Sequence, residues 1–199
     1  MIPGLIEPGA PSPLADLVTA ADGLRVIGLD LSITSTGIAL PDGSTFRIKT
    51  RQKDGDVRLL VIRAAVRGAL VEHEPHLAVI EDLPTKMRPT AVKGIGGLHG
   101  VVKAELLDAG VPYAVVAPAT LKSYAADHGN ADKPRMAAAA FLAAGAEFDD
   151  DAGGDQCDAW WLRAAGHDHY GKALFNLPQA QRERLTKVSW PGLTREQSA

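Results

Sequence analysis

Short apolar runs that end in polar or turn residues alternate along this chain with longer segments of helical periodicity. The branched apolar runs at 24–31 and 76–81 predict buried strands, because such short runs bounded by turn signals are typical of sheet interiors. The dipeptide Asp42-Gly43 is a strong hairpin signal between two further strands. The expected elements are strands at 24–31, 36–41, 44–50, 76–81 and 111–117, and helices at 56–74, 91–109, 118–126, 132–145 and 155–167.

The order of these elements predicts the fold class. Three meandering strands followed by alternating helices and strands indicate an α/β fold, in which three antiparallel strands and then parallel strands form a mixed sheet flanked by helices. In such a layout the strand at 24–31 is central and lies beside the strand at 76–81. The Pro- and Gly-rich residues 1–23 are expected to form an N-terminal arm, residues 24–170 the domain, and residues 171–199 a peripheral C-terminal extension.

Four acidic residues stand at positions that could aim carboxylates at one point. Asp30 and Glu81 end the two central strands, and Asp155 and Asp158 are three residues apart on one face of the last helix. Buried carboxylates need compensation, and hard divalent cations such as Mg²⁺ take oxygen ligands. Two such ions roughly 3.5–4 Å apart can activate water against a phosphodiester. The pattern therefore predicts a metal-dependent nuclease.

Each acid also has a simpler structural interpretation. Asp30 could cap a turn with Ser32, Glu81 could be a solvated strand end, and Asp155 could be the N-cap of its helix. Capping alone does not account for the ordered set of two strand-end acids and one helical pair, and the order favours the metal site.

The segments that carry these acids resemble a known family. Residues 27–37, 80–81, 118–133 and 155–162 are similar to the RuvC-type Holliday-junction resolvases of the ribonuclease H-like superfamily. The resemblance runs from about residue 24 to residue 169. It implies a ribonuclease H-like sheet and a homodimer that makes two symmetric nicks in a four-way junction, leaving 5′-phosphates. It also implies two Mg²⁺ or Mn²⁺ ions held by Asp30, Glu81, Asp155 and Asp158.

The same resemblance assigns two lysines. Lys122 and Lys133 match family segments whose lysines approach the DNA near the scissile phosphate, although an ordinary solvated lysine is the alternative, and it is preferred for Lys122. One position departs from the family pattern. Pro84 stands three residues after Glu81, where family members often carry an aromatic residue that probes the opened junction. The departure puts junction distortion in doubt, but not the metal chemistry.

Charge distribution bears on DNA binding more than the net charge of −3 does. Between residues 44 and 68 there are seven basic residues against two acidic ones, which could serve DNA or form a solvated face. Between residues 84 and 103 there are four basic residues and no acidic one. By resemblance, Lys86, Arg88 and Lys93 of this second segment would flank the active site and bind DNA.

The helix expected at 91–109 has an amphipathic pattern. By resemblance it leads into a dimer helix, so its apolar positions Leu98, Val101, Val102 and Leu106 could face a partner subunit. Periodicity does not distinguish a dimer face from an intramolecular core face.

Histidine and cysteine add little to the site. His128 and His167 are minor candidates near the final acids, since a lone histidine is more often structural than a ligand. The single cysteine, Cys157, provides no disulfide framework and is expected to pack in the interior of a protein from a reducing compartment.

The resulting hypothesis is an endonuclease that cuts branched DNA, most simply four-way junctions, with Lys133 stabilising charge at the phosphate. The chain has no run of about 20 apolar residues, so a membrane location is not expected and a cytosolic one is. Two alternatives remain open: a junction-binding protein without catalysis, and an ATP-using enzyme of the actin or sugar-kinase class. The second alternative lacks a further Gly-rich phosphate motif.

Overall fold

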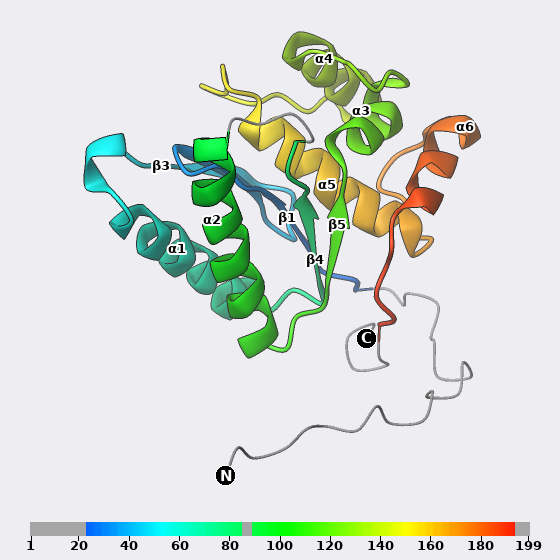
Figure 1. Ribbon diagram of the computed structural model, residues 1–199. Coiled ribbons are helices and arrows are strands. Elements are labelled where there is room, and N and C mark those ends of the chain that lie inside the picture. Colours follow the sequence, from blue (N-terminus) through cyan, green and yellow to red (C-terminus); the bar gives the residue numbers. More distant parts are fainter. Residues whose placement is uncertain (1–22, 85–88, 194–199) are drawn as a thin grey trace.

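The computed structural model, which describes residues 23–84 and 89–193, has a five-stranded sheet with helices on both faces (Figure 1). The strand order is β3-β2-β1-β4-β5, in which β1, β2 and β3 are antiparallel neighbours and β4 and β5 run parallel to β1. This arrangement confirms the predicted mixed sheet. The strands are β1 (Val26–Asp30), β2 (Ser35–Ala39), β3 (Thr45–Lys49), β4 (Leu77–Glu81) and β5 (Tyr113–Val116).

Each helix expected from periodicity is present, with ends that differ by a few residues. The longer helices are α1 (Val57–His73), α2 (Pro89–Asp108), α3 (Pro118–Ala126), α4 (Lys133–Ala144) and α5 (Asp155–His169). The short ones are η2 (Gln52–Asp54), α6 (Gln179–Arg182) and η3 (Glu183–Lys187). The start of α4 shows how the sequence sets a boundary. Asp132 is its N-cap, because the Asp132 carboxylate accepts a hydrogen bond of 3.0 Å from the Arg135 amide.

The alternation of side chains along β1 and β4 decides where the two strand-end acids point. Ile27 and Leu29 of β1 pack in the core on the α1 and α2 side, whereas Val26 packs in the core on the α5 side. Because alternate residues share a face, Asp30 projects to the same side as Val26, toward α5. In β4 the same alternation places Glu81 on the α5 side with Val79.

Helices α1 and α2 cover one face of the sheet, as Figure 1 shows on its left side. Leu98, Val102 and Leu106 of α2 are completely buried there, together with Ile62 and Val66 of α1. The apolar stripe of α2 is therefore a core face. Three of the four positions that resemblance assigned to a dimer contact are instead used within the chain, and the fourth, Val101, is partly buried.

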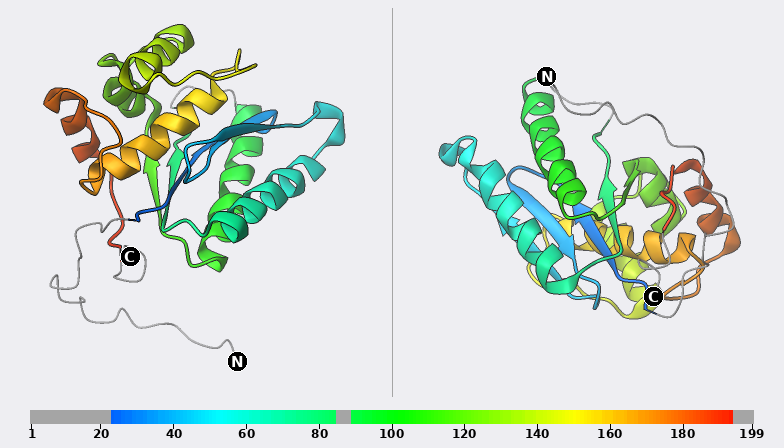
Figure 2. Two further views of the ribbon diagram at one scale, coloured as in Figure 1. Left: turned by 180° about the vertical axis from the view of Figure 1, so that it is seen from behind. Right: turned by 90° about the horizontal axis from the view of Figure 1, so that it is seen from below.

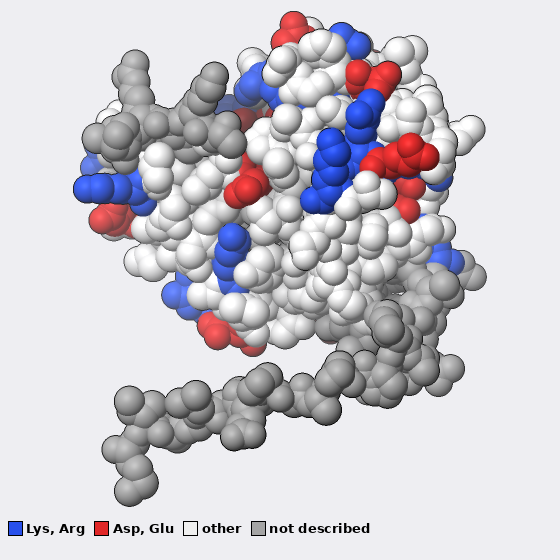
Figure 3. Space-filling view, turned by 45° about the vertical axis from the view of Figure 1, so that its right-hand side comes forward, with Lys and Arg blue, Asp and Glu red and all other residues white. Residues whose placement is uncertain are grey.

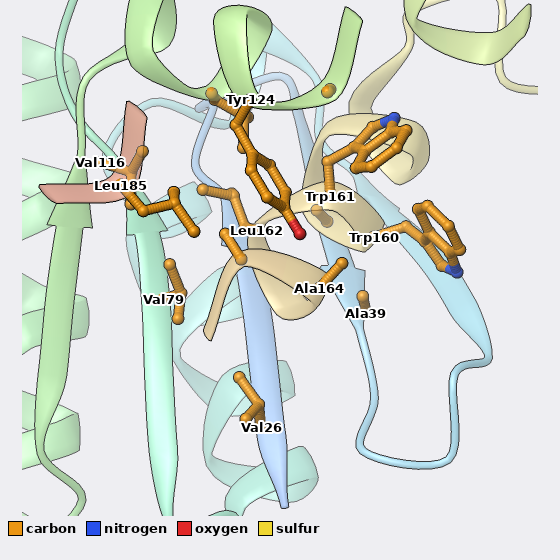
Figure 4. Packing of buried hydrophobic residues seen from close by; sticks show 14 of the residues in the cluster. Val26, Ala39, Val79, Val116, Tyr124, Trp160, Trp161, Leu162, Ala164 and Leu185 are labelled. Atoms are coloured by element: carbon orange, nitrogen blue, oxygen red, sulfur yellow. The ribbon is translucent and has the colours of Figure 1, made fainter. Parts of the chain in front are cut away.

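Helix α5 crosses the other face, against β1, β2 and β4 (Figure 2). Two glycines permit its close approach. A Cβ atom added to Gly28 would lie 2.0 Å from the Ala159 carbonyl oxygen, and one added to Gly37 would lie 1.9 Å from the Asp155 carbonyl oxygen. Trp160 and Trp161 of α5 fill the core on this side, where Tyr124 packs edge-on against Trp161 (Figure 4).

The segment after residue 174 is not the peripheral tail that its composition suggested. Leu185 and Leu193 are buried in the α5-side core, and the Gln181 side-chain amide donates a 2.9 Å hydrogen bond to the Tyr124 carbonyl oxygen. Residues up to 193 therefore help to hold α3 and α5 in place. The arm expected at the N-terminus lies outside the described residues, apart from Gly23.

Across residues 23–84 and 89–193, no helix combines the length and the apolar character that a membrane crossing requires.

Candidate active site

The four predicted acids come together from three elements. Asp30 and Glu81 end the parallel neighbours β1 and β4, whose register pairs Leu29 with Ile80, so the two acids emerge at the same sheet edge. The carboxyl groups of Asp30 and Glu81 lie close enough to influence each other's pKa. Asp155 and Asp158 lie in the first turn of α5, which packs over this edge. The fold thus collects four carboxyl groups at one place.

The electrostatics of the site reflect this crowding. Burial raises the pKa of Asp30 well above its ordinary value, and the nearby charges of Glu81, Asp158 and Asp155 raise it further. Burial, followed by the charge of Asp158, raises the pKa of Glu81 to about 7. Burial likewise raises the pKa of Asp158 to about 6. Carboxyl groups so arranged cannot all ionise near neutral pH without a nearby positive charge.

Two lysines supply part of that charge. Lys122 of α3 and Lys133 of α4 both act to lower the pKa values of Glu81 and Asp158. The Lys133 ammonium nitrogen is 4.0 Å from Oδ1 of Asp155. Both lysines that resemblance assigned to the scissile phosphate therefore stand beside the acids.

The chemistry of the donor set fits divalent ions such as Mg²⁺ or Mn²⁺. The acids offer only carboxylate oxygens, which hard cations prefer, and a cation would relieve the repulsion that raises their pKa values. Within the described residues, no group of three or more His, Cys, Asp or Glu side chains is already arranged to hold a metal ion. The structure therefore brings candidate ligands together at one edge without forming a complete coordination sphere.

Sequence reasoning missed the side chains that surround Asp155. The Ser35 hydroxyl donates a 2.5 Å hydrogen bond to Oδ2 of Asp155, and Nη1 of Arg47 is 3.9 Å from the same oxygen. Arg47 also pairs with Asp150 at 3.1 Å, and its Nε atom is 3.7 Å from Asp151. The one available signal was the presence of a basic segment around residue 47 and an acidic run at 149–151, which are far apart in sequence but complementary in charge.

Asp151 has a separate structural role at the start of α5. Its carboxylate accepts hydrogen bonds of 3.1 Å and 3.0 Å from the backbone amides of Gln156 and Cys157. These amides belong to the first turn of the helix and have no partner within it. Asp151 therefore caps the helix that carries the two final acids.

Several basic residues between 44 and 68 are used within the chain. Arg63 and Arg67 of α1 pair with the buried Glu105 of α2 at 2.7 Å and 2.5 Å, and Arg51 pairs with Asp54 at 3.3 Å. On the face seen in Figure 3, basic side chains stand beside acidic ones and form no continuous basic field. The structure thus favours an intramolecular role for much of this stretch.

The remaining predicted DNA contacts are only partly described. Lys93 is exposed on α2, on the segment that follows β4. Lys86 and Arg88 lie outside the described residues.

Of the two histidine candidates, His167 lies on α5 and His128 lies in the loop between α3 and α4. His167 is twelve residues beyond Asp155 on α5, which corresponds to about 18 Å along a helix. Burial lowers its pKa to about 4. His128 is exposed between α3 and α4, and its Nδ1 atom accepts a 3.3 Å hydrogen bond from the Asn130 amide of the same loop. The structure does not bring His167 to the carboxylates.

Comparison with known sequences identifies relatives of the chain. The model of the family described as "Crossover junction endodeoxyribonuclease RuvC" matches residues 20–144, which is more than half of the chain. The protein of that name from Paenarthrobacter aurescens is 32% identical over 120 residues, which cover 55% of this chain and 64% of the relative. The one from Pseudarthrobacter chlorophenolicus is 30% identical over 120 residues, which cover 55% of this chain and 62% of the relative. The chain thus spans less than two thirds of these curated relatives.

Comparison with solved structures supports the same fold. The Thermus thermophilus RuvC structure matches with a TM-score of 0.62 and 23% sequence identity, over 75% of this chain and 98% of that chain. A second structure, "T. thermophilus RuvC in complex with Holliday junction substrate", matches with a TM-score of 0.63 and 23% identity over the same fractions. The family-model match ends at residue 144, before α5, so the placement of Asp155 and Asp158 rests on the geometry described above.

Proposed function

Because the chain belongs to the RuvC family of crossover junction endodeoxyribonucleases, we propose that it cuts four-way (Holliday) junctions or related branched DNA in recombination. The observation that carries this proposal is the convergence of Asp30, Glu81 and the first turn of α5 at one sheet edge. The names of the sequence relatives and the solved complex of T. thermophilus RuvC with a Holliday junction support the choice of substrate.

In the proposed reaction, Asp30, Glu81, Asp155 and Asp158 hold two Mg²⁺ or Mn²⁺ ions. The bound ions supply an activated water molecule and neutralise charge at the phosphodiester. The raised pKa values of Asp30, Glu81 and Asp158 are consistent with acids that need a cation in order to be fully ionised. In the proposed reaction water attacks the phosphorus and the bond from phosphorus to O3′ breaks, so the cut leaves a 5′-phosphate and a 3′-hydroxyl.

Lysine side chains assist at the phosphate in this proposal. Lys133 stands beside Asp155 and can stabilise negative charge that develops on the phosphate oxygens. Lys122 faces the same acids and can contact the DNA backbone. Lys86, Arg88 and Lys93 belong to the proposed DNA contacts next to the site.

We also propose that the enzyme acts as a homodimer in the cytosol. A four-way junction has two-fold symmetry, and a two-fold dimer would place one active site at each of two equivalent phosphates. Sedimentation analysis of the protein alone and with junction DNA measures the subunit number directly.

The function is tested by incubating the protein with labelled four-way junction, flap and linear duplex DNAs, in Mg²⁺ or in EDTA. The test variant is Asp158→Asn, and the matched control is Asp108→Asn, an exposed aspartate at the end of α2. We expect paired nicks in the junction with Mg²⁺ and none with EDTA. Asp158→Asn should lower the rate roughly 100-fold or more, since even outer partners of metal ligands contribute about 10–100-fold.

Two results would contradict the proposal. Junction binding without cutting in any divalent cation would identify a binding protein, and cutting by Asp158→Asn at the rate of Asp108→Asn would remove Asp158 from the ligand set.

A further inference from the structure

Asp155 is held from one side by groups that no motif of the sequence assigned. Oδ2 of Asp155 accepts the 2.5 Å hydrogen bond from Ser35 and lies 3.9 Å from Nη1 of Arg47. Oδ1 faces the other way, toward Lys133 at 4.0 Å. The Asp155 side chain is only 14% exposed, so these neighbours restrict how its carboxylate can turn.

The sequence Ser35-Thr36-Gly37 explains why a hydroxyl reaches this carboxylate. Ser35 and Gly37 are two residues apart on β2 and therefore share the face of the sheet that α5 covers. Gly37 has no side chain, which lets the Asp155 backbone approach β2 directly. Close approach at Gly37 brings the start of α5 within hydrogen-bonding distance of Ser35.

Gly153 keeps the space beside Oδ2 open. A Cβ atom added to Gly153 would lie 2.6 Å from Oδ2 of Asp155 and 3.2 Å from Oδ1. The obstructed atoms are the end of a side chain, so an alanine at this position would force the carboxylate out of the orientation that Ser35 holds and leave the backbone largely in place. Ser35 and Gly153 thus constrain the same group from two directions.

We propose that Ser35 is a positioning residue for Asp155. The Ser35 hydroxyl holds Oδ2 of Asp155 and so presents Oδ1 to the catalytic cation. Gly153 makes this orientation possible. The inference rests on the proposed function for the identity of the cation site, but it concerns side chains that can be tested without DNA.

The experiment measures Mn²⁺ binding to the full chain by calorimetry and by the paramagnetic resonance signal of free Mn²⁺. The variants are Ser35→Ala, Ser35→Thr and Gly153→Ala. The matched control is Ser44→Ala, which removes another serine-to-aspartate hydrogen bond, the 2.7 Å bond to Asp42 in the β2–β3 turn. Urea unfolding of each variant separates altered cation binding from lost stability.

We expect Ser35→Ala and Gly153→Ala each to weaken Mn²⁺ binding by roughly 10-fold, the lower end of the effect of outer partners on metal affinity. The Mn²⁺ affinity of Ser35→Thr, which keeps the hydroxyl, should stay within about threefold of that of the parent. The Mn²⁺ affinity of Ser44→Ala should equal that of the parent. The Ser35→Ala/Gly153→Ala double variant should be no weaker than the single ones, because both changes act through one carboxylate.

The proposal is overturned if Ser35→Ala binds Mn²⁺ as the parent does, or if Ser35→Thr is as weak as Ser35→Ala. Fully additive losses in the double variant would also overturn it. A parent protein that binds Mn²⁺ normally but cuts no branched DNA would contradict the proposed function alone, since the comparison among variants would still decide the role of Ser35.

Discussion

Replacing Gly28 by alanine tests whether the contact between β1 and α5 sets both stability and the site. The new Cβ atom would lie 2.0 Å from the Ala159 carbonyl oxygen and 2.8 Å from the Arg163 backbone nitrogen. Carbon and oxygen atoms approach no closer than about 3.3 Å even in favourable C–H···O contacts. The strand and the helix must therefore separate by roughly 1 Å.

The obstructing atoms at Gly28 are backbone atoms of a buried helix, which no rotamer change can move. Overpacking of a core costs typically about 1–3 kcal/mol, and we expect the upper end, about 3 kcal/mol. The lower entropy of an unfolded chain with alanine offsets only about 0.4–1 kcal/mol of this. A domain of ordinary stability would remain folded, because native proteins are stable by about 5–15 kcal/mol.

Urea unfolding measures the effect at Gly28 as a change in the free energy of unfolding. Gly68→Ala on the exposed face of α1 is the matched control, because a Cβ atom there would meet nothing within 4 Å. The control should be more stable than the parent by about 0.5–1 kcal/mol. Mn²⁺ binding should weaken in Gly28→Ala only, since α5 carries two of the acids. A Gly28→Ala protein as stable as the parent would refute the packing argument.

Three further predictions concern other parts of the fold. His167, whose pKa is lowered by burial to about 4, stays neutral in the folded state while the unfolded chain takes up a proton below pH 6.5. The contribution of His167 to stability should therefore fall by up to about 3 kcal/mol as pH falls from 6.5 to 4. It is measured as the difference in the free energy of unfolding between the parent and His167→Gln at each pH, because protonation of Glu81 and Asp158, whose pKa values are raised, changes the total stability in the opposite direction. Arg47→Met should lower the free energy of unfolding by about 2–3 kcal/mol. This is less than the full cost of breaking a buried pair, because Asp151 keeps its backbone partners. An unchanged free energy of unfolding would contradict the ion pairs assigned to Arg47. Leu98→Ala should lower the free energy of unfolding of the monomer by about 2–5 kcal/mol. Leu107→Ala, which changes a side chain that is 67% exposed, should lower it by less than about 1 kcal/mol. Equal effects would argue against a core role for Leu98.

Local patterns in the sequence were sufficient to predict most of the fold. The strands that contain Asp30 and Glu81 stand out because a charge ends an apolar run in each, and period-two alternation then places both acids on one face. The fold class, the hairpin at Asp42-Gly43 and the helices follow from turn residues and periodicity, which are properties of neighbouring positions.

The surroundings of Asp155 could not be predicted in the same way. Ser35 and Asp155 are 120 positions apart, so their hydrogen bond depends on the docking of α5 onto β2 and has no local signature. The burial of Leu185 and Leu193 was missed for a related reason, because isolated apolar residues in a Pro-containing segment show no hydrophobic periodicity. The sequence did not decide whether the apolar face of α2 packs within the chain or against a partner subunit. Periodicity indicates that a helix face is buried, but not which surface covers that face.

Helix α5 is buried from Gln156 to His167 except at Asp158, and it also carries the last two acids. Its amide hydrogens should therefore exchange with solvent only through whole-molecule opening, at the slowest rates in the chain. Two of the four acids thus depend on the part of the molecule that opens least often. Loss of the candidate active site should then coincide with loss of the whole fold and should not precede it through fraying of one helix end.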